Sequence, residues 1–371
     1  MILSPWQSPG PDAVVVGTGR VTLDVVVRKG QARSEARSQA GGTCGNVLIN
    51  LACLGWEAYP LADLGDDEPG RSFSRDLARW GVHLDLIEHY PDQESPVIIH
   101  LLEEGTEGIR HSFTSACPFC GRMLKYYEPV PLPHLKDRLA RLPPAKVFFF
   151  DRDSPGSLRL ARMYREQGAL VMYETNYAGP ESQLAEALAV SHVVKFAAEK
   201  LSELAEHHPL AGPWLLIETR GEQGLRYRDQ RRTGAATWQS LPAFRVTRVR
   251  DAGGAGDWCT AGLLHLLARG GAAEFLRNSA EQLREALTFG QALGAWNCAF
   301  EGARGGMYQV SRKTWQRDVD RILRREVFDP EASSSASTLD LAGAFCRGCS
   351  STPELDHRTV SNHSGSTGDA E

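Results

Sequence analysis

Short apolar stretches alternate with longer segments of helical periodicity between about residues 12 and 303. Runs rich in β-branched and aromatic residues predict strands, and segments in which apolar residues recur every three or four positions predict helices. The predicted strands are 13–16, 146–150, 170–173, 190–194 and 214–218, and the predicted helices include 46–54, 71–80, 157–167 and 180–188. This alternation is typical of an α/β fold, with a central, mostly parallel β-sheet flanked by helices on both faces.

Two stretches depart from this alternation. Residues 21–28 and 96–114 alternate apolar and polar positions, and the turn Glu104-Gly105-Thr106 divides the second stretch into an antiparallel hairpin. We expect a small β-sheet beside the main one, built from about residues 20–30 and 96–115. Such a layer can act as a lid that closes over a pocket and excludes water from a reaction.

The composition changes near the end of the chain. After about residue 330, serine, threonine, glycine and aspartate dominate and hydrophobic residues become sparse. We therefore expect one folded domain over 12–325, followed by a flexible, serine-rich tail over 326–371. Within the tail, only 339–349 has enough apolar content to dock onto the domain.

Overall composition narrows the class of protein. The 371 residues are 42% hydrophobic and 23% charged, which is enough for a large core, and no apolar window is long enough to span a bilayer. Residues 1–12 lack the basic-then-apolar order of a signal peptide, which predicts a cytoplasmic protein. The formal net charge of −5 argues against a nucleic-acid partner, because phosphate neutralisation needs a basic surface. One local basic cluster favours a solvated hairpin and consists of Arg226, Arg228, Arg231 and Arg232.

A glycine-rich turn carries the chemistry. Residues 251–257 read Asp-Ala-Gly-Gly-Ala-Gly-Asp and lead directly into a segment of helical periodicity. Glycines let the backbone approach a ligand, and the N–H groups of a first helical turn bind anions. We interpret Asp257 as the base that takes a proton from an attacking hydroxyl, while the N–H groups of Gly254, Ala255 and Gly256 stabilise a transferred phosphoryl group. The alternative is that Asp257 only caps the helix.

This run resembles the D-T-x-G-A-G-D signature of the ribokinase-like (PfkB-type) carbohydrate and nucleoside kinases, with Ala252 where Thr is usual. The first signature of that family is matched by Gly41-Gly42-Thr43-Cys44-Gly45-Asn46, by Leu54-Gly55 and by Gly65-Asp66-Asp67-Glu68-Pro69-Gly70. Two signatures roughly 200 residues apart, in the order of the family, are hard to reach by chance. The resemblance covers about residues 12–316 and implies a ribokinase-like fold. It also implies an ATP-dependent kinase that phosphorylates a hydroxyl of a small sugar or sugar-like molecule.

The resemblance assigns roles to further residues. Those that would hold the substrate hydroxyls are Asp24, Gly41, Gly42 and Asn46. A lid-edge surface charge is the alternative for Asp24, and a helix N-cap is the alternative for Asn46. Those that would lie along the nucleotide are Asn176, Glu199, Thr219, Gly221, Gly224 and Gly302, although a glycine turn after a strand can be only a turn. Phe196 stands where the family carries the Asn of its N-x-x-E segment, which leaves Glu199 either to order the magnesium water shell or to be an exposed helix-start carboxylate.

The implied cofactors are ATP and Mg²⁺, since phosphoryl transfer requires charge neutralisation on the β- and γ-oxygens, together with a monovalent cation. The expected partners are the small-molecule substrate, ATP and a second copy bound through the lid, without nucleic acid or membrane. Two rival interpretations stay open. A nucleoside kinase would use aromatic residues such as Phe113 and Phe119 to stack on a base. A kinase-like binding or regulatory protein, which holds a ligand without transfer, is favoured by Phe196 and Ala252.

Four of the eight cysteines form two C-x-x-C pairs, Cys117 with Cys120 and Cys346 with Cys349. The first pair, followed by Gly121, has the shape of a zinc-knuckle turn. Four such thiolates make a tetrahedral Zn²⁺ site if the tail folds back towards the lid. A redox pair or simple reduced thiols are the alternatives.

Overall fold

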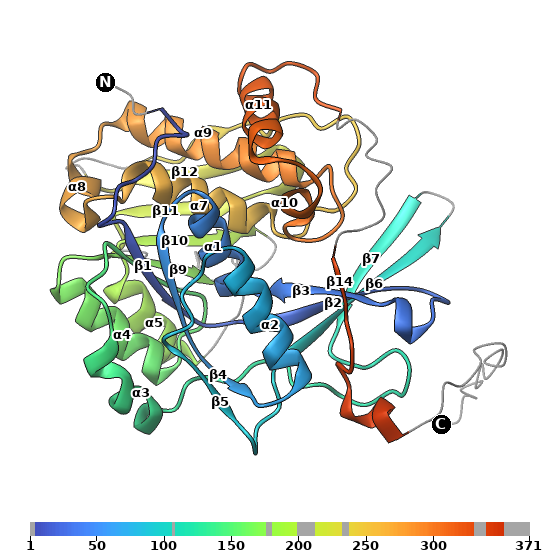
Figure 1. Cartoon of the computed structure of the whole chain (residues 1–371). Coiled ribbons are helices and arrows are strands. Elements are labelled where there is room, and N and C mark those ends of the chain that lie inside the picture. The colour runs from blue at the N-terminus through green and yellow to red at the C-terminus, as the bar shows by residue number, and fades with distance from the viewer. Residues whose placement is uncertain are drawn as a thin grey trace, which may run out of the picture.

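The structure is a computed structural model and describes residues 4–105, 108–175, 180–198, 212–231, 237–329 and 339–351. Figure 1 shows a large sheet enclosed by helices and a second, smaller sheet that projects from its side. The segments at both ends of the described chain lie on the outside of this arrangement. The predicted α/β class with a small β-lid is confirmed.

Nine strands of the described chain form the large sheet, in the order β13-β12-β11-β10-β9-β8-β1-β4-β5. Their bounds are β1 (Val14–Thr18), β4 (Glu57–Gly65), β5 (Ile87–Tyr90), β8 (Val147–Phe150), β9 (Leu170–Thr175), β10 (Val193–Ala197), β11 (Leu215–Thr219), β12 (Leu225–Asp229) and β13 (Gln239–Leu241). All neighbours from β5 to β11 are parallel, and β12 and β13 continue the sheet as antiparallel strands. Parallel strands align their carboxyl ends at one edge, which is where ligands of such sheets bind.

Helices cover both faces of this sheet (Figure 1). They are α1 (Thr43–Cys53), α2 (Glu68–Arg79), α3 (Leu132–Arg138), α4 (Pro155–Glu166), α5 (Glu181–Val190), α7 (Ala255–Leu267), α8 (Gly271–Arg277), α9 (Ala280–Asn297), α10 (Gly305–Gln309) and α11 (Arg312–Leu323). Short 3₁₀ turns lie at Arg33–Glu35, Leu139–Arg141, Gly221–Gln223 and Arg347–Ser351. One apolar cluster joins α1, α7 and α9 to the sheet, and a second joins α4 and α5 to the opposite face.

Close helix packing fixes α7 in place. A Cβ atom added to Gly262 of α7 would lie 2.6 Å from the Cα of Gly290 on α9, so the two backbones approach more closely than larger residues permit. Trp258 and Trp296 fill the adjoining space with their ring centroids 6.0 Å apart. The first turn of α7 is therefore held by a packed, inflexible scaffold.

Strands β4 and β5 of the main sheet were not predicted, and one predicted strand, 190–194, is displaced. The structure places Val190 at the end of α5, and β10 begins only at Val193. The Ser191 hydroxyl donates to the Ala187 carbonyl at 2.7 Å, which satisfies the end of the helix and delays the strand. The β-branched side chain of Val190 favours a strand locally, but tertiary packing keeps it helical.

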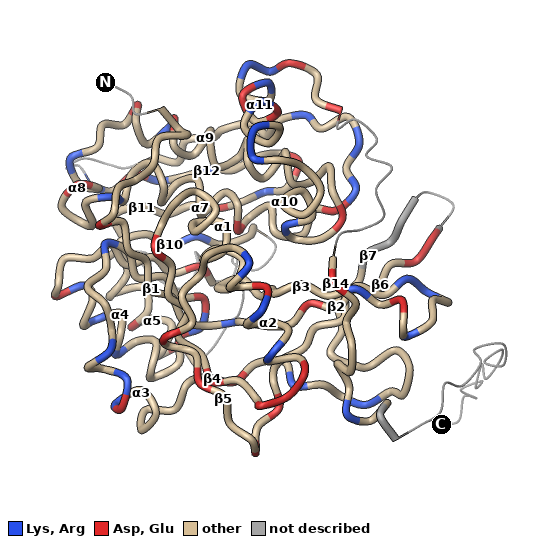
Figure 2. Tube along the Cα trace, viewed as in Figure 1, with Lys and Arg blue, Asp and Glu red and all other residues tan. Residues whose placement is uncertain are grey.

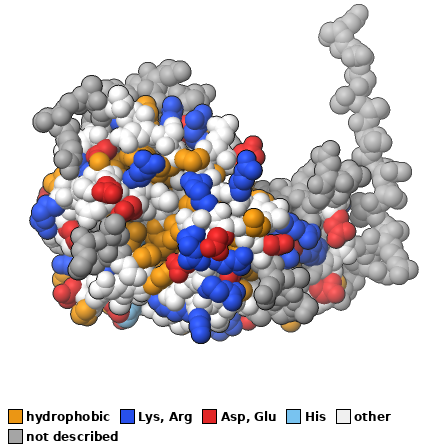
Figure 3. All heavy atoms as spheres, turned by 90° about the horizontal axis from the view of Figure 1, so that it is seen from above, with side chains coloured by type: hydrophobic (Ala, Val, Ile, Leu, Met, Phe, Trp, Pro, Cys, Tyr) orange, Lys and Arg blue, Asp and Glu red, His pale blue; other side chains and the backbone are white. Residues whose placement is uncertain are grey.

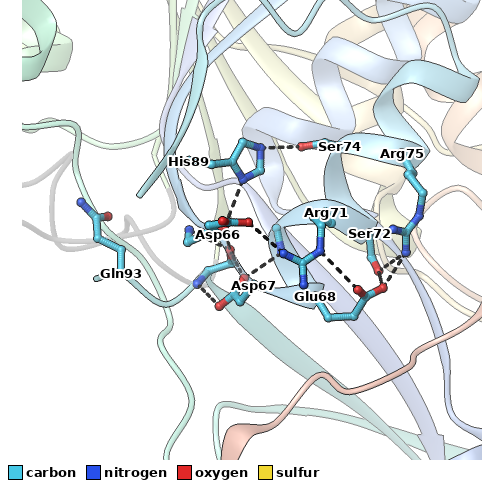
Figure 4. Close-up of polar contacts among 12 residues, drawn as sticks. Asp66, Asp67, Glu68, Arg71, Ser72, Ser74, Arg75, His89 and Gln93 are labelled. Carbon is cyan, nitrogen blue, oxygen red and sulfur yellow. Dashed lines mark hydrogen bonds and ion pairs between the residues drawn. The ribbon is translucent and has the colours of Figure 1, made fainter. Parts of the chain in front are cut away.

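The helix that follows the first signature begins with a capping network, shown in Figure 4. Asp67 is the N-cap of α2, and its Oδ1 accepts hydrogen bonds from the Gly70 N–H at 3.0 Å and from the Ser95 hydroxyl at 2.6 Å. Arg71 donates to Asp66 at 2.8 Å on the exposed side. Because Ser95 immediately precedes the lid strands, this part of the signature ties the lid to the main domain.

The small sheet has the strand order β14-β3-β2-β6-β7. Its strands are β2 (Thr22–Arg28), β3 (Arg37–Gly41), β6 (Val97–Gly105), β7 (Gly108–Thr114) and β14 (Asp340–Leu341). The predicted hairpin is confirmed, because β6 and β7 pair in antiparallel register. The pattern did not predict β3, and β14 comes from the tail stretch that was expected to dock.

Charged residues lie mainly along the outer helices and loops, whereas the central strands are largely uncharged (Figure 2). On the face seen from above, basic and acidic side chains are interspersed (Figure 3). Within the basic cluster, Arg226 pairs with Glu218 at 2.5 Å and Arg231 with Asp229 at 2.8 Å, both in or beside the β11–β12 hairpin, and Arg232 lies outside the described residues. None of the helices in the described ranges combines the length and the apolar character that crossing a bilayer demands.

A buried ion pair anchors α3 to the main sheet. The guanidinium of Arg138 is fully buried, pairs with Asp63 at the end of β4 and donates to the Ala62 carbonyl at 3.2 Å. Removing one member of a buried pair leaves the other charge without compensation.

We expect Arg138→Met to lower the free energy of unfolding by about 3–5 kcal/mol, because the buried Asp63 carboxylate then loses its main partner. Arg141→Met is the matched control, since Arg141 is 49% exposed and its pair with Glu88 is solvated. The control should cost less than about 1 kcal/mol. Urea unfolding of the three proteins measures the difference, and equal losses for both variants would contradict the assignment.

Candidate active site

The glycine-rich turn lies at the start of α7, as the sequence predicts. Gly254 is the N-cap with φ +72°, and a Cβ atom there would lie 2.3 Å from the Ala303 carbonyl oxygen. Asp257 is in the first turn of α7 and is buried. The Ala255 N–H donates to the Ala252 carbonyl at 3.3 Å, so the N–H groups that the helix leaves open for an anion are those of Gly256 and Asp257. Ala252, which stands where Thr is usual, is exposed, so this departure lies outside the buried part of the turn.

The buried carboxyl of Asp257 meets an oriented amide. Asn46 on α1 donates its Nδ2–H to Asp257 Oδ2 at 2.7 Å, and its Oδ1 accepts from Arg304 Nε at 3.0 Å. Because the guanidinium only donates, it fixes which end of the Asn46 amide faces Asp257. The sequence analysis missed Arg304, although an arginine directly after the predicted Gly302 loop was a signal. Asn46 lies inside α1, whose N-cap is Gly42, so the alternative that Asn46 is a helix N-cap is wrong.

Arg304 belongs to a wider buried network. It is fully buried, donates to the Ala40 carbonyl and pairs with Asp76 on α2 at 3.3 Å. The Tyr308 hydroxyl donates to the same Asp76 oxygen at 2.6 Å. Through these contacts the orientation of Asn46 depends on β3, α2 and α10 together.

The residues expected to hold the substrate lie at the junction of the lid and α1. Asp24 on β2 accepts from the Thr22 hydroxyl at 2.6 Å and is partly buried, which raises the pKa of its carboxyl. A Cβ atom on Gly41 would lie 2.0 Å from Asp24 Oδ2, so only glycine allows this approach. Gly42, with φ +78°, is the N-cap of α1, and its carbonyl accepts from the Asn46 N–H at 2.8 Å. Asp24, Gly41, Gly42 and Asn46 therefore form one continuous wall.

Asp251 joins the glycine turn to the loop that carries Gly302. Its two carboxylate oxygens accept from the Gly253 N–H and from the Gly302 N–H, each at 2.8 Å. Asn297 donates to the Gly253 carbonyl at 3.0 Å. His100 of lid strand β6 lies 3.7 Å from Asp251, which brings the lid against the same turn.

A buried ion pair lies beneath the helix start. Lys195 on β10 pairs with Glu174 on β9, and the Thr260 hydroxyl donates to the other Glu174 oxygen at 2.7 Å. A Cβ atom on Gly256 would lie 3.3 Å from Lys195 Nζ. Burial opposes the charged form of Lys195, but the Glu174 carboxylate holds its pKa above the ordinary value. A lysine within an apolar strand run was the available signal, since lysine is rarely buried without a function or a partner.

Burial strongly raises the pKa of the Asp257 carboxyl. Its pKa is raised to about 8, first because the carboxyl is desolvated and second because the Glu174 carboxylate is near. Lys195 and the Asn46 hydrogen bond act in the opposite direction. A carboxyl that titrates near neutral pH is suited to act as a general base.

The structure describes some of the residues that were predicted to bind the nucleotide. Thr219 ends β11, and its hydroxyl donates to the Phe196 carbonyl at 3.3 Å on the neighbouring strand. Gly221 and Gly224 follow in a tight turn with φ +54° and +91°. Asn176 and Glu199 lie outside the described residues. Thr219 and the turn lie one strand away from Lys195, at the same edge of the sheet as Asp257.

Solved structures share the fold of this chain. The structure of a fructokinase with bound ATP from Xylella fastidiosa superposes with a TM-score of 0.64 at 20% identity, covering 84% of this chain and 98% of that one. An aminoimidazole riboside kinase from Salmonella enterica, complexed with aminoimidazole riboside and an ATP analog, gives 0.61 at 22% identity, covering 84% and 99%. A ribokinase from Arabidopsis thaliana is also similar, with a TM-score of 0.59, 20% identity and coverage of 84% and 99%. The fold is therefore ribokinase-like.

Sequence comparisons narrow this class. Residues 148–309 match the model of the "pfkB family carbohydrate kinase". The probable fructokinase-4 of Arabidopsis thaliana is 26% identical over 325 residues, which are 80% of this chain and 94% of the relative. Fructokinase-1 of Oryza sativa subsp. japonica is 26% identical over 323 residues, which are 79% and 94%. The chain is thus similar to the pfkB family of carbohydrate kinases over residues 148–309, and to the fructokinases over most of its length.

We expect Gly254→Ala to destabilise the protein more than Gly81→Ala. Both glycines have similar left-handed φ values, +72° and +75°, but an added Cβ meets nothing within 4 Å at Gly81 and a backbone oxygen at 2.3 Å at Gly254. Each variant bears the left-handed cost of about 1–2 kcal/mol, and Gly254→Ala adds about 1–3 kcal/mol of overpacking. Urea unfolding measures both, and indistinguishable losses would rule out the close contact with the Ala303 loop.

Proposed function

We propose that this protein is an ATP-dependent kinase that transfers the γ-phosphoryl group of ATP to a hydroxyl of a small sugar, with Asp257 as the general base. The observation that carries the proposal is the buried Asp257 carboxyl at a glycine-rich helix start, facing the oriented amide of Asn46. A proton acceptor and the N–H groups of a first helical turn lie together there. The fructokinase relatives favour a hexose such as fructose as the acceptor.

In this proposal the substrate lies between the lid and α7. Asp24 and the backbone at Gly41 and Gly42 hold its hydroxyl groups, and Asn46 holds the Asp257 carboxylate in place. Asp257 accepts the proton of the attacking hydroxyl as the oxygen displaces ADP from the γ-phosphorus in line. The N–H groups of Gly256 and Asp257, above the Lys195 ammonium, stabilise the negative charge on the transferred group.

The nucleotide side of the proposal rests on the edge formed by β10 and β11. The Lys195 ammonium lies beside Gly256, 3.3 Å from where a Cβ atom would be, and this positive charge at the glycine turn suits a phosphate. Thr219, Gly221, Gly224 and Gly302 are assigned to the nucleotide with Asn176. Mg²⁺ would neutralise charge on the β- and γ-oxygens of ATP. Glu174 has both oxygens engaged by Lys195 and Thr260, so we assign the water shell of the metal to Glu199. A monovalent cation and a cytoplasmic location are also part of this proposal.

The proposal includes a homodimer formed through the lid. The two ends of the lid sheet, among the described residues, are β14, which pairs with β3, and β7. Phe113 on β7 is 60% exposed and stacks on His100 with ring centroids 4.5 Å apart. Phe119 instead faces Phe345 of the tail at 6.2 Å, so of the two aromatic candidates for base stacking only Phe113 is exposed on the lid.

An ATP-consumption assay with a panel of hexoses, pentoses and nucleosides tests the function. We expect a hexose to give the highest kcat/KM, and Asp257→Asn to lower kcat by about 10²–10⁴-fold with ATP binding retained, because only the proton acceptor is lost. Asp318→Asn is the matched control, as a buried aspartate on α11 whose partner is Arg317. Highest turnover with a nucleoside supports the nucleoside-kinase alternative. ATP binding without turnover of any acceptor supports the regulatory one.

The rate should also depend on pH through Asp257. Its raised pKa of about 8 means that the carboxyl is mostly protonated below that pH, so kcat/KM should fall about tenfold per pH unit on the acid side. Glu174→Gln removes a negative charge that raises this pKa, and should move the midpoint to lower pH. Asn46→Ala removes a hydrogen bond that lowers it, and should move the midpoint to higher pH.

Profiles of kcat/KM against pH for the wild type, both variants and Asp318→Asn measure these midpoints. The height of each profile will also change, since both residues lie in the site, so the midpoint alone is the readout. Shifts of Glu174→Gln and Asn46→Ala in the same direction would show that Asp257 is not the titrating base.

A further inference from the structure

Four cysteines from distant parts of the chain meet beside the lid. Cys117 and Cys120 follow lid strand β7, and Cys346 and Cys349 lie in the C-terminal segment. Their four Sγ atoms all lie within 4.8 Å of one another. Three of the side chains are buried, and Cys120 is exposed. Thiols are not needed by the proposed phosphoryl transfer, so the cluster calls for a separate explanation.

The spacing of the sulfur atoms fits one metal ion. Cys117 Sγ and Cys349 Sγ are 3.5 Å apart, and Cys120 Sγ and Cys346 Sγ are 3.6 Å apart. A Zn²⁺ ion bound by four thiolates at about 2.3 Å in a tetrahedron requires sulfur–sulfur distances of about 3.8 Å. A disulfide bond requires about 2.0 Å, and all four cysteines are free. The four sulfur atoms already have nearly the separation that the ion requires.

The backbone around the first pair forms the turn that holds a thiolate–metal centre. The Gly121 N–H donates to the Cys117 carbonyl at 2.9 Å, and Gly121 has φ +75°, which closes the turn. The backbone N–H groups of Phe119 and Cys120 point at Cys117 Sγ, and that of Arg122 points at Cys120 Sγ. Such N–H donors stabilise negatively charged sulfur.

Glycine and arginine complete the surroundings. A Cβ atom on Gly348 would lie 3.2 Å from Cys120 Sγ, so a glycine between the two tail cysteines lets the segments approach. Arg122 and Arg347 both approach Glu94, at 2.6 and 3.7 Å. Arg347 also lies 3.7 Å from Asp67, so two carboxylates balance the two guanidinium groups beside the cluster.

We propose that Cys117, Cys120, Cys346 and Cys349 bind one Zn²⁺ ion as thiolates, and that this ion fastens the C-terminal segment to the lid. Apart from the cluster, the segment is held by the short strand β14, by its buried side chains Ala342 and Phe345 and by a few hydrogen bonds. Strand β14 has only two residues, and the Ala342 N–H donates to the Ala36 carbonyl at 2.8 Å beside it. Strands this short are not stable by themselves, whereas a four-thiolate zinc site contributes folding energy directly.

The fastening has a consequence for the substrate wall. The zinc-bound segment covers the edge of β3, where Arg37 donates to the Leu339 carbonyl at 3.2 Å, and Arg33 donates to the Cys349 carbonyl at 2.9 Å. In Figure 1 the C-terminal segment runs past β3 and β2 towards the outer side of the lid. Strand β3 ends at Gly41. The ion therefore supports the strand that presents one wall of the proposed sugar site.

Metal content of the full-length protein, produced in medium that contains zinc and iron and purified without chelator, tests the site. Elemental analysis should give about one Zn per chain and no stoichiometric Fe. Cys120→Ser and Cys349→Ser should each remove most of this zinc, and Cys53→Ser, a half-buried cysteine on α1 outside the cluster, should retain it. Stoichiometric iron, free thiols without metal after zinc is offered, or disulfides within the cluster would each overturn the proposal.

Hydrogen exchange of the wild-type protein separates the fastening role from misfolding of variants. Zinc is removed with a zinc-selective chelator and then restored. Amides of 339–351 and of β3 should exchange about tenfold faster or more without zinc and recover with it, while β10 and β11 stay unchanged. If zinc binds but its removal leaves exchange in 339–351 unaltered, the fastening role is wrong. Because neither measurement uses turnover, both stand apart from the proposed kinase activity.

Discussion

The site depends on the hydrogen bond from Asn46 to the buried Asp257 carboxyl, which joins the start of α1 to the start of α7. Burying a carboxyl disfavours its charged form, so it is tolerated only where oriented donors are near. Here one donor is supplied from α1, and the amide that donates is itself oriented by Arg304. Desolvation and the nearby Glu174 carboxylate raise the pKa of Asp257 to about 8, and the Asn46 hydrogen bond limits this rise.

To keep that hydrogen bond, the starts of α1 and α7 must be held in fixed positions. Arg304 reaches Ala40 on β3 and Asp76 on α2, and Asp251 holds the glycine turn to the Gly302 loop. A displacement of either helix start would therefore leave buried polar groups without partners, each at a cost of about 1–3 kcal/mol. The site is rigid on this side because its polar groups satisfy one another.

The lid side depends on different forces. Strand β3 contributes Gly41 to the substrate wall, and its outer edge pairs with the two-residue strand β14 from the end of the described chain. The four-cysteine cluster lies where that cover is attached. A tail held by a metal ion would order the lid sheet more firmly than the hydrogen bonds of the two-residue strand β14 do alone.

Much of this was determined by local sequence. Apolar periodicity predicts the strands and helices because side-chain burial repeats every second or every third to fourth residue, and the glycine turn before Asp257 predicts an anion site because only glycine permits its φ and its close approach. The sequence predicted that a strand begins at Val190, but this residue ends α5. Its side chain favours a strand locally, and helix packing outweighs that preference. Strand β3 was not predicted, because its surroundings rather than its pattern make it a strand.

The tertiary structure alone decided which charged groups meet. Nothing local links Lys195 to Glu174, or Arg304 to Asn46, because such pairs are made by packing between elements 21 and 258 residues apart. The same holds for the cysteines, where the spacing within each C-x-x-C pair is local and the meeting of the two pairs is not. The sequence by itself determined the elements and the kind of chemistry at Asp257. The fold decided the partners that tune its charge, since electrostatic environment depends on distance in space and not along the chain.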